Sequence, residues 1–265
     1  MTYSHLLPSV IEIAHAAGEI ILKHFNSGTE ASFKEDKSPL TAADLESNDY
    51  IVRQLAALTP QIPIISEETI PESFDNRRNW DTFWLVDPLD GTKEFVKRTG
   101  QFTVNIGLIS QGKPVLGVIA VPVMRLRYYS AEGDGAYFEN LETETKHAIA
   151  VRALDVDHID IVASKDHAGP MVQALSDQFP NAGFKSMGSS LKFCLIAAGE
   201  ADVYLRDVPT MEWDTAAAHA ILLEAGGQIY TLDQKVLTYN KESLRNPSIL
   251  TVADQSEFWF QKVKE

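Results

Sequence analysis

The spacing of apolar side chains predicts two amphipathic helices near the N-terminus. From Leu6 to Phe25, apolar residues recur every three or four positions, which is typical of a helix with one buried face. A second helix is predicted from Thr41 to Leu58, because Thr41 is a favourable N-cap residue and an acid, Asp44, stands three positions later. The residues predicted to face inward on this helix are Leu45, Ile51, Leu55 and Leu58.

A polar stretch separates these two helices and contains the charged run Lys34–Lys37. Such a run is typical of a solvated surface loop. A loop that closes over an active site has the same composition, so the pattern leaves both interpretations open.

Short apolar runs then predict strands. Ile62–Ile65 and Phe83–Val86 each end in acidic residues, which suggests that the two strand ends converge on one pocket. After a short helix over Lys93–Arg98, β-rich runs separated by turn residues predict an antiparallel meander. Its strands are expected at Phe102–Ile109, Val115–Val121 and Leu126–Ala131. Helices followed by clustered strands indicate an α+β unit over residues 1–152.

From about Ala153 the pattern changes, and strands alternate with helices. The predicted strands are Ile159–Ala163, Val203–Leu205, Ile229–Tyr230 and Ile249–Val252. The predicted helices are Met171–Phe179, Leu191–Ala198, Thr215–Ala225 and a C-terminal helix from Gln255. This alternation predicts an α/β unit over residues 153–265. Because no Pro- or Ser-rich linker separates the halves, we expect them to pack together with a cleft between them.

Composition narrows the class of protein. The 265 residues carry a formal net charge of −14, which disfavours nucleic-acid polymers and anionic membrane surfaces as partners. The single cysteine, Cys194, lies in an apolar stretch and predicts a buried thiol in a reducing cytoplasm. The N-terminus lacks a signal-peptide pattern, and the most apolar run, Val115–Val123, is too short to span a bilayer. We expect a cytoplasmic protein without an integral membrane segment. Peripheral attachment to the cytoplasmic side of the inner membrane stays open, as does the choice between monomer and homodimer.

The most informative segment is Asp87-Pro88-Leu89-Asp90-Gly91-Thr92. Pro88 has no N–H and is expected to stop the preceding strand at Asp87. Two carboxylates are then followed by a glycine and a helix start, where backbone N–H groups become accessible. Oxygen ligands for a cation beside N–H donors for an anion are what a metal-assisted phosphate site requires.

Further acids are predicted to join this segment. Asp44 follows the N-cap, and Glu67 is preferred over Glu68 because adjacent side chains of an extended segment point to opposite sides. Asp214 stands where a helix of small residues begins, and an N-cap role would also explain it. Carboxylates gathered in this way would repel one another without a divalent cation. All-oxygen ligands favour Mg²⁺, with Mn²⁺ as a second candidate, and the scattered histidines give zinc little support.

The motifs of several other enzyme classes are absent from the sequence. It has no Gly-x-x-x-x-Gly-Lys-Ser/Thr loop, no Gly-x-Gly-x-x-Gly fingerprint and no Gly-x-Ser-x-Gly elbow. The chemistry that fits is phosphate-ester hydrolysis, with one metal ion lowering the pKa of a water and another stabilising the leaving oxygen. Thr92, backed by a carboxylate, can take the proton of the water, while the Gly91 and Thr92 N–H groups hold phosphate oxygens.

Three segments resemble the signatures of the inositol monophosphatase superfamily, whose members are Mg²⁺-dependent, Li⁺-sensitive phosphatases. These segments are Glu67–Glu68, Asp87–Thr92 and Trp213–Ala217. Within the superfamily, Asp90–Phe95 and Gly188–Phe193 resemble bacterial 3′(2′),5′-bisphosphate nucleotidases of the CysQ type. That branch removes the 3′-phosphate of 3′-phosphoadenosine 5′-phosphate to leave AMP during sulfate assimilation, and the corresponding phosphosulfate is a further candidate substrate.

The resemblance implies a layered αβαβα sandwich and a role for each matching residue. It places a first metal ion on Glu67, Asp87 and the carbonyl of Leu89, and a second on Asp87, Asp90 and Asp214. Glu67 would also contact a third, loosely bound ion and is counted among the catalytic residues. The pair that activates water would be Asp44 and Thr92. The residues expected to contact the substrate are Glu67, Leu89, Asp90, Gly91, Thr92, Ser189, Ser190, Lys192 and Asp214.

One departure from the branch pattern concerns Asp207, which stands where branch members usually have an aromatic residue. A carboxylate at this position could accept sugar hydroxyls, so the choice between a nucleotide and an inositol or sugar phosphate stays open. A regulatory binding protein of the same fold is the alternative from a different class.

Overall fold

Two β-sheets form the framework of the protein in a computed structural model that describes residues 3–28, 31–33, 39–69, 71–163 and 169–264. The larger sheet has the spatial order β3-β4-β5-β6-β7-β8-β9. Its strands are β3 (Ile64–Ser66), β4 (Thr82–Asp90), β5 (Thr103–Ser110), β6 (Lys113–Val121), β7 (Leu126–Ala131), β8 (Gly135–Asn140) and β9 (Thr145–Ile149). The meander predicted over β5 to β7 is confirmed. It continues into β8 and β9, neither of which was predicted. β9 was missed because it is largely exposed and carries little apolar alternation.

The smaller sheet has the order β11-β10-β12-β14-β13. Its strands are β10 (Asp160–Ala163), β11 (Gly183–Ser186), β12 (Val203–Arg206), β13 (Gln228–Thr231) and β14 (Ile249–Val252). β10 runs parallel to β11 and β12, whereas β14 runs antiparallel to β12 and β13. The edge strand β11 was not predicted, and its Phe184 side chain is exposed. A separate pair, β1 (Ala31–Phe33) and β2 (Pro39–Thr41), is antiparallel, and the charged run 34–37 lies outside the described residues.

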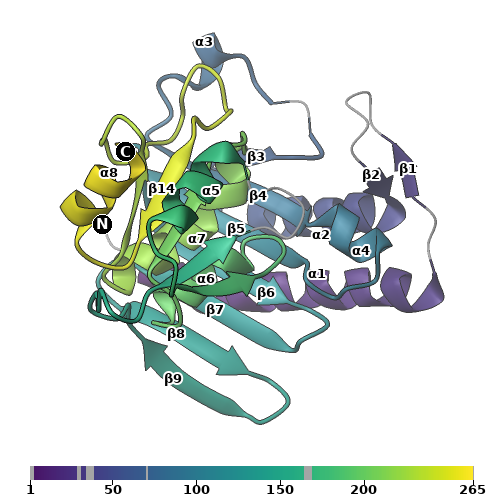
Figure 1. Ribbon diagram of the computed structural model, residues 1–265. Coiled ribbons are helices and arrows are strands. Elements are labelled where there is room, and N and C mark those ends of the chain that lie inside the picture. The colour runs from purple at the N-terminus through teal and green to yellow at the C-terminus, as the bar shows by residue number, and fades with distance from the viewer. Residues whose placement is uncertain (1–2, 29–30, 34–38, 70, 164–168, 265) are drawn as a thin grey trace.

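Helices complete a five-layer αβαβα sandwich (Figure 1). The outer layer on the larger sheet contains α1 (Leu7–Ser27), preceded by a 3₁₀ turn, and α2 (Ala42–Leu58). Between the sheets lie α6 (Leu191–Ala197) and α7 (Glu212–Glu224), and the outer face of the smaller sheet is covered by α5 (Pro170–Asp177) and α8 (Ser256–Lys264). Two short helices, α3 (Phe74–Arg77) and α4 (Thr92–Val96), flank β4 in the sequence. The predicted fold class is therefore confirmed.

The inward face predicted for α2 is only partly right. Ile51 and Leu55 have no exposed surface, but Leu45 is 45% exposed. At 100° per residue, the six positions from Leu45 to Ile51 turn the helix well away from a common face. Asp44 and Ser47 occupy buried positions of the first turns instead, so this end of α2 presents polar groups to the interior.

Pro88 does not end its strand as expected. β4 continues to Asp90, with a register shift in its pairing to β5 between Asp87 and Asp90. The missing N–H of Pro88 falls inside this irregularity, where no regular ladder hydrogen bond is required. Pairing resumes where Asp90 lies opposite Thr103. Because of the bulge, the side chains of Asp87 and Asp90 do not follow the regular alternation of the strand.

The central helix α7 approaches the larger sheet closely because two glycines lie beneath it. A Cβ atom at Gly117 would lie 2.2 Å from the carbonyl oxygen of Ala217, and one at Gly107 would lie 2.8 Å from the Ala217 nitrogen. One apolar core therefore contains residues of both sheets and of α7. The division at residues 152 and 153 falls between β9 and β10 and stays a prediction.

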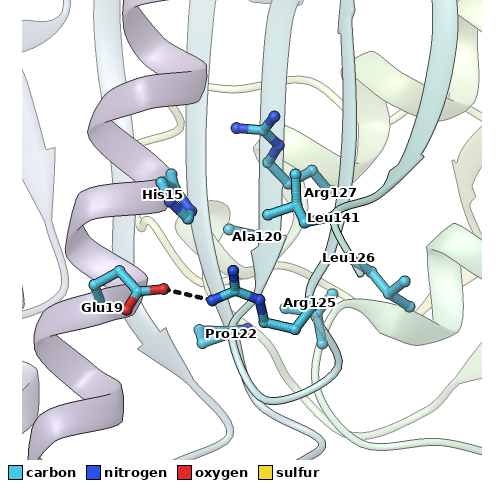
Figure 2. A pocket seen from close by; sticks show the side chains of 10 residues that line it. His15, Glu19, Ala120, Pro122, Arg125, Leu126, Arg127 and Leu141 are labelled. Carbon is cyan, nitrogen blue, oxygen red and sulfur yellow. Dashed lines mark hydrogen bonds and ion pairs between the residues drawn. The ribbon is translucent and has the colours of Figure 1, made fainter. Parts of the chain in front are cut away.

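The helix α1 is held against the larger sheet along its length. Its buried side chains include Val10, Ala14 and Ile21, and Figure 2 shows Glu19 reaching Arg125 after β6, with a carboxylate-to-guanidinium distance of 2.9 Å. The cavity beside this ion pair measures about 10 Å³, which is room for one water molecule at most. By length and composition alone, Ser4–Ser27 could span a membrane, but its packing is that of a core helix.

Replacing Gly117 by alanine should destabilise the protein by about 3 kcal/mol, because the new methyl group overlaps the backbone of α7. Urea unfolding followed by fluorescence measures the change. The control is Gly133→Ala, where nothing lies within 4 Å and only the positive φ opposes the substitution, at about 1 kcal/mol. Equal losses in the two variants would contradict the close packing of α7.

A buried histidine on α7 should make stability fall in acid. His219 is fully buried between the Tyr239 hydroxyl and the Gln228 side chain, and burial lowers its pKa to about 4. The unfolded chain, with an ordinary His pKa near 6.5, binds the proton first, so this contribution is complete above pH 6.5 and is lost as the pH falls towards 4. The loss amounts to about 3 kcal/mol. The difference in unfolding free energy between wild type and His219→Gln should therefore shrink over this range. A constant difference would contradict the assignment.

Candidate active site

Two parallel strand ends bring the first pair of carboxylates together. β3 pairs with β4 so that Ser66 lies opposite Val86, and the Glu67 N–H donates to the Val86 carbonyl at 3.1 Å. Glu67 and Asp87 therefore leave the sheet at the same edge. The charge of Glu67 helps to raise the pKa of Asp87, which agrees with the expectation that Glu67 points towards this site.

The bulge after Asp87 is held by its own side chain. Asp87 is 1% exposed, and its Oδ1 accepts a hydrogen bond from the Leu89 N–H at 3.0 Å. Ser47 of α2 donates to the carbonyl oxygen of Pro88 at 3.1 Å. Gly91 follows with a φ of 92°, a left-handed conformation that glycine adopts without strain. These contacts orient the turn before α4 begins.

Asp44 makes hydrogen bonds to both residues considered as its partners, Thr41 and Thr92. Its Oδ2 accepts hydrogen bonds from the Thr41 N–H at 2.7 Å and from the Thr41 hydroxyl at 2.6 Å, which completes the capping of α2. Its Oδ1 accepts a hydrogen bond from the Thr92 hydroxyl at 3.1 Å. Burial raises the pKa of Asp44 against the opposing effect of these hydrogen bonds. The predicted pair of Asp44 and Thr92 is therefore in hydrogen-bond contact.

Asp90 faces the other half of the chain. Its Oδ2 accepts hydrogen bonds from the Ser190 N–H at 2.6 Å and from Asn105 Nδ2 at 3.4 Å. Burial raises the pKa of Asp90 to about 6, although the nearby ammonium group of Lys192 lowers it. The Ser190 hydroxyl is turned inward and lies 2.8 Å from Asn105 Oδ1. Ser190 therefore contacts the side chains of Asp90, Asn105 and Thr103, and its predicted contact with a nucleotide stays a prediction.

The start of α7 differs from the prediction and gives Asp214 another position. The helix begins at Glu212 and not at Thr215, so Met211 is the N-cap and Asp214 lies in the first turn. Asp214 Oδ2 accepts a hydrogen bond from the Met211 N–H at 2.8 Å. An acid in the first turn can accept the N–H of the N-cap residue, and sequence alone did not distinguish the two positions. Asp214 and Asp90 line the same cavity.

The nearby cations Lys192 and Arg206 offset only part of the mutual repulsion of the clustered acids. Burial, followed by the charges of neighbouring carboxylates, raises the pKa of Asp87 and Asp214 well above the ordinary value. Among the described residues, no three acidic, histidine or cysteine side chains are gathered tightly enough to form a finished metal site. Both Asp44 and Asp214 use an oxygen to cap a helix. The donors are hard oxygens, which are the ligands that Mg²⁺ prefers.

A cavity of about 150 Å³ lies beside these acids. Its lining includes the acids Asp90 and Asp214 and the cations Lys192 and Arg206. Lys192 is 6% exposed, and burial lowers its pKa to about 8 against the stabilising charge of Asp90. The further lining residues are Gly91, Lys93, Glu94, Ser189, Ser190, Phe193, Tyr204 and Thr210.

Sequence analysis did not assign Arg206 to the site. Arg206 ends strand β12, and the same signal, a charged residue at a predicted strand end, had identified Glu67 and Asp87. Asp207, in contrast, lies against Gly169, where a Cβ atom would come within 1.8 Å of its Oδ2. Asp207 is not among the described residues that line the cavity, and its buried Oδ1 has no hydrogen-bond partner within the part of the chain that the structure describes.

Comparison with known proteins agrees with this fold. A sequence model of the inositol monophosphatase family matches residues 3–259. The chain belongs to the inositol monophosphatase family. Among its relatives, the 3′(2′),5′-bisphosphate nucleotidases CysQ of Salmonella typhimurium and Escherichia coli K12 are each 44% identical to it, over 91% of this chain and 97% of theirs.

Solved structures of the inositol monophosphatase family lead to the same conclusion. The crystal structure of CysQ from Bacteroides thetaiotaomicron, a bacterial family member, superposes with a TM-score of 0.84 at 40% identity. It covers 96% of this chain and 98% of its own. An inositol monophosphatase from Thermotoga maritima, 23% identical over 97% of this chain and 96% of its own, shares the fold with a TM-score of 0.77.

Removing one carboxylate from the cluster should stabilise the metal-free protein. Because the pKa of Asp87 is raised, its charged form is disfavoured in the folded state, so Asp87→Asn should gain about 1 kcal/mol in EDTA, or about 2–4 °C in Tm. The same variant should lose the rise in Tm that Mg²⁺ gives the wild type. Differential scanning fluorimetry with EDTA and with Mg²⁺ measures both effects.

Asp202→Asn is the matched control for this prediction. Asp202 is as buried as Asp87, but its Oδ1 accepts a hydrogen bond from Arg152 at 2.8 Å. Its charge is therefore paired with a cation and not with the other carboxylates. This variant should lower the Tm and keep the response to Mg²⁺. An unchanged Mg²⁺ response in Asp87→Asn would refute its place in the metal site.

Proposed function

We propose that this chain is a 3′(2′),5′-bisphosphate nucleotidase that converts 3′-phosphoadenosine 5′-phosphate and water to AMP and phosphate. The names of its CysQ relatives, together with their identity over nearly their whole length, support this substrate class. The observation that carries the proposal is a cavity whose lining includes both carboxylates and cations. The carboxylates Asp90 and Asp214 suit a metal-assisted phosphate, and Lys192 and Arg206 suit a second phosphate on the same molecule.

The metal requirement of the proposal rests on the oxygen donors. Glu67, Asp87 and the carbonyl of Leu89 would hold one Mg²⁺, and Asp87, Asp90 and Asp214 a second. A third, loosely held ion at Glu67 and the use of Mn²⁺ belong to the same proposal. When bound, these ions lower the pKa of a water and stabilise negative charge on the leaving oxygen.

The residues of the chain supply the proton path. A water next to Thr92 can give its proton to Thr92 Oγ1 while the proton of that hydroxyl passes to Asp44 Oδ1, 3.1 Å away. The raised pKa of Asp44 makes its carboxylate a better proton acceptor than an exposed aspartate. Gly91 and Thr92 would hold the phosphate under attack, and Ser189, Ser190 and Lys192 would lie towards the nucleotide.

The proposal includes a cytoplasmic location. The only cysteine, Cys194, is buried, which is compatible with a reducing compartment. The net charge of −14 fits a partner that is a small molecule accompanied by metal ions.

Phosphate release from three substrates tests the function. With Mg²⁺, kcat/KM for 3′-phosphoadenosine 5′-phosphate should exceed that for inositol 1-phosphate by at least about tenfold. This ratio corresponds to one additional charge-assisted interaction with the second phosphate. Lys192→Gln should raise KM for the bisphosphate by about tenfold and leave hydrolysis of 3′-AMP, which lacks the 5′-phosphate, nearly unchanged. A preference for inositol 1-phosphate would overturn the nucleotidase assignment.

Asp90→Asn provides the inactive control for these assays. It should lose turnover of every ester by at least about 100-fold and keep the circular dichroism spectrum of the wild type. Near-normal activity in this variant would refute the role of Asp90 in metal binding. Absence of phosphate release by the wild type, with Mg²⁺ and with Mn²⁺, would favour a regulatory binding protein.

A further inference from the structure

A buried carboxylate near the site has no part in the proposed chemistry. Glu212, the first residue of α7, has no exposed surface and lies two residues before Asp214. Its Oε1 accepts hydrogen bonds from Lys241 Nζ at 2.6 Å and from the Lys241 N–H at 3.0 Å. Its Oε2 accepts one from the Asn240 N–H at 2.8 Å. Glu212 therefore binds the loop 238–246 to the start of α7.

From Glu212, hydrogen bonds lead back to Asp214. Lys241 Nζ also donates to Asn246 Oδ1 at 3.0 Å, and Asn246 Nδ2 donates to the Met211 carbonyl at 2.8 Å. The Met211 N–H in turn donates to Asp214 Oδ2 at 2.8 Å. The cap residue of α7 is thus held on both of its backbone groups. One oxygen of Asp214 is occupied in a fixed direction, while the residue still lines the cavity.

The same loop also holds the segment that follows Glu67. Arg77, at the end of α3, is 3% exposed and donates from Nη1 to Asn240 Oδ1 at 2.8 Å and from Nη2 to the Glu242 carbonyl at 2.7 Å. Asn240 Nδ2 returns a hydrogen bond to the Arg77 carbonyl at 2.8 Å. The loop 238–246 therefore joins the two parts of the chain that carry Glu67 and Asp214.

Stability alone is a poor explanation for this arrangement. Desolvation of a buried ion pair offsets most of its Coulomb attraction, so such a pair contributes little net stability compared with apolar residues of the same size. Burial lowers the pKa of Lys241, the partner of Glu212, which is the expected sign of that desolvation. The helix α7 already has extensive apolar packing against both sheets. What the pair adds is a defined position for the first turn of α7.

We propose that Glu212 is a positioning residue for the metal site, acting with Lys241 through Asn246 and Met211 on Asp214. This inference rests on the proposed function for the identity of the ligands. Outer residues that orient metal ligands typically change metal affinity by about 10–100-fold when replaced. Glu212→Gln keeps the size of the side chain, but its amide nitrogen must face an N–H donor of Asn240 or Lys241.

Direct measurement of metal binding tests this role without depending on turnover. Mn²⁺ is titrated into the metal-free full chain without substrate, and the free ion is quantified by electron paramagnetic resonance. Glu212→Gln should bind Mn²⁺ at least about tenfold more weakly than the wild type. The matched control is His219→Gln on the same helix, which replaces an equally buried residue and should bind within about twofold of the wild type.

Each result decides the inference. Binding by Glu212→Gln within about twofold of the wild type overturns it, and so does an equal loss in His219→Gln, because general loosening of α7 then explains both. If Glu212→Gln does not fold, Lys241→Gln is judged by the same criterion, since that side chain is 26% exposed and tolerates replacement better. A wild type that binds Mn²⁺ but hydrolyses no ester rejects the proposed function alone. A wild type that binds no Mn²⁺ rejects the metal site, and the positioning role with it.

Discussion

The close packing of α7 on the larger sheet is the contact on which the rest of the structure depends. It requires the absence of side chains at Gly107 and Gly117, where any Cβ would meet the backbone of Ala217. This contact joins the two sheets through one apolar core. It also brings the first turn of α7, with Asp214, to the edge where β4 ends in Asp87 and Asp90. The candidate site therefore exists only when the two halves of the chain are packed together.

The clustered acids at that edge lower the stability of the folded state when no metal is bound. Asp87 is buried beside other carboxylates, and its raised pKa shows that the charged form is disfavoured there. Backbone N–H groups orient three of these acids: the Thr41 N–H on Asp44, the Ser190 N–H on Asp90, and the Met211 N–H on Asp214. Proteins commonly retain such unfavourable groups at functional sites, because their purpose is to hold a ligand and not to stabilise the chain.

Local patterns predicted most elements, and the errors have physical causes. The meander β5–β7 and the strand β14 were found because their apolar runs are long or sharply bounded. The edge strands β9 and β11 were missed because much of their surface is exposed, so selection for apolar side chains is weak there. Proline is excluded from regularly paired central strands, so Pro88 predicted the end of its strand. The structure places it in a bulge, which tolerates the missing N–H.

The sequence by itself determined the chemistry of the site, because Asp87–Thr92 places carboxylates, a glycine and a hydroxyl within six residues. It also identified Asp44, Glu67 and Asp214 as candidates from their places at helix and strand ends. Only the tertiary structure decided which groups meet: Asp44 with Thr92, Asp90 with Ser190, and the cations Lys192 and Arg206 with the acids that line the cavity. The reason is that these contacts join residues far apart in the chain. Their distances depend on how the sheets and α7 pack, and no local pattern of side chains encodes that packing.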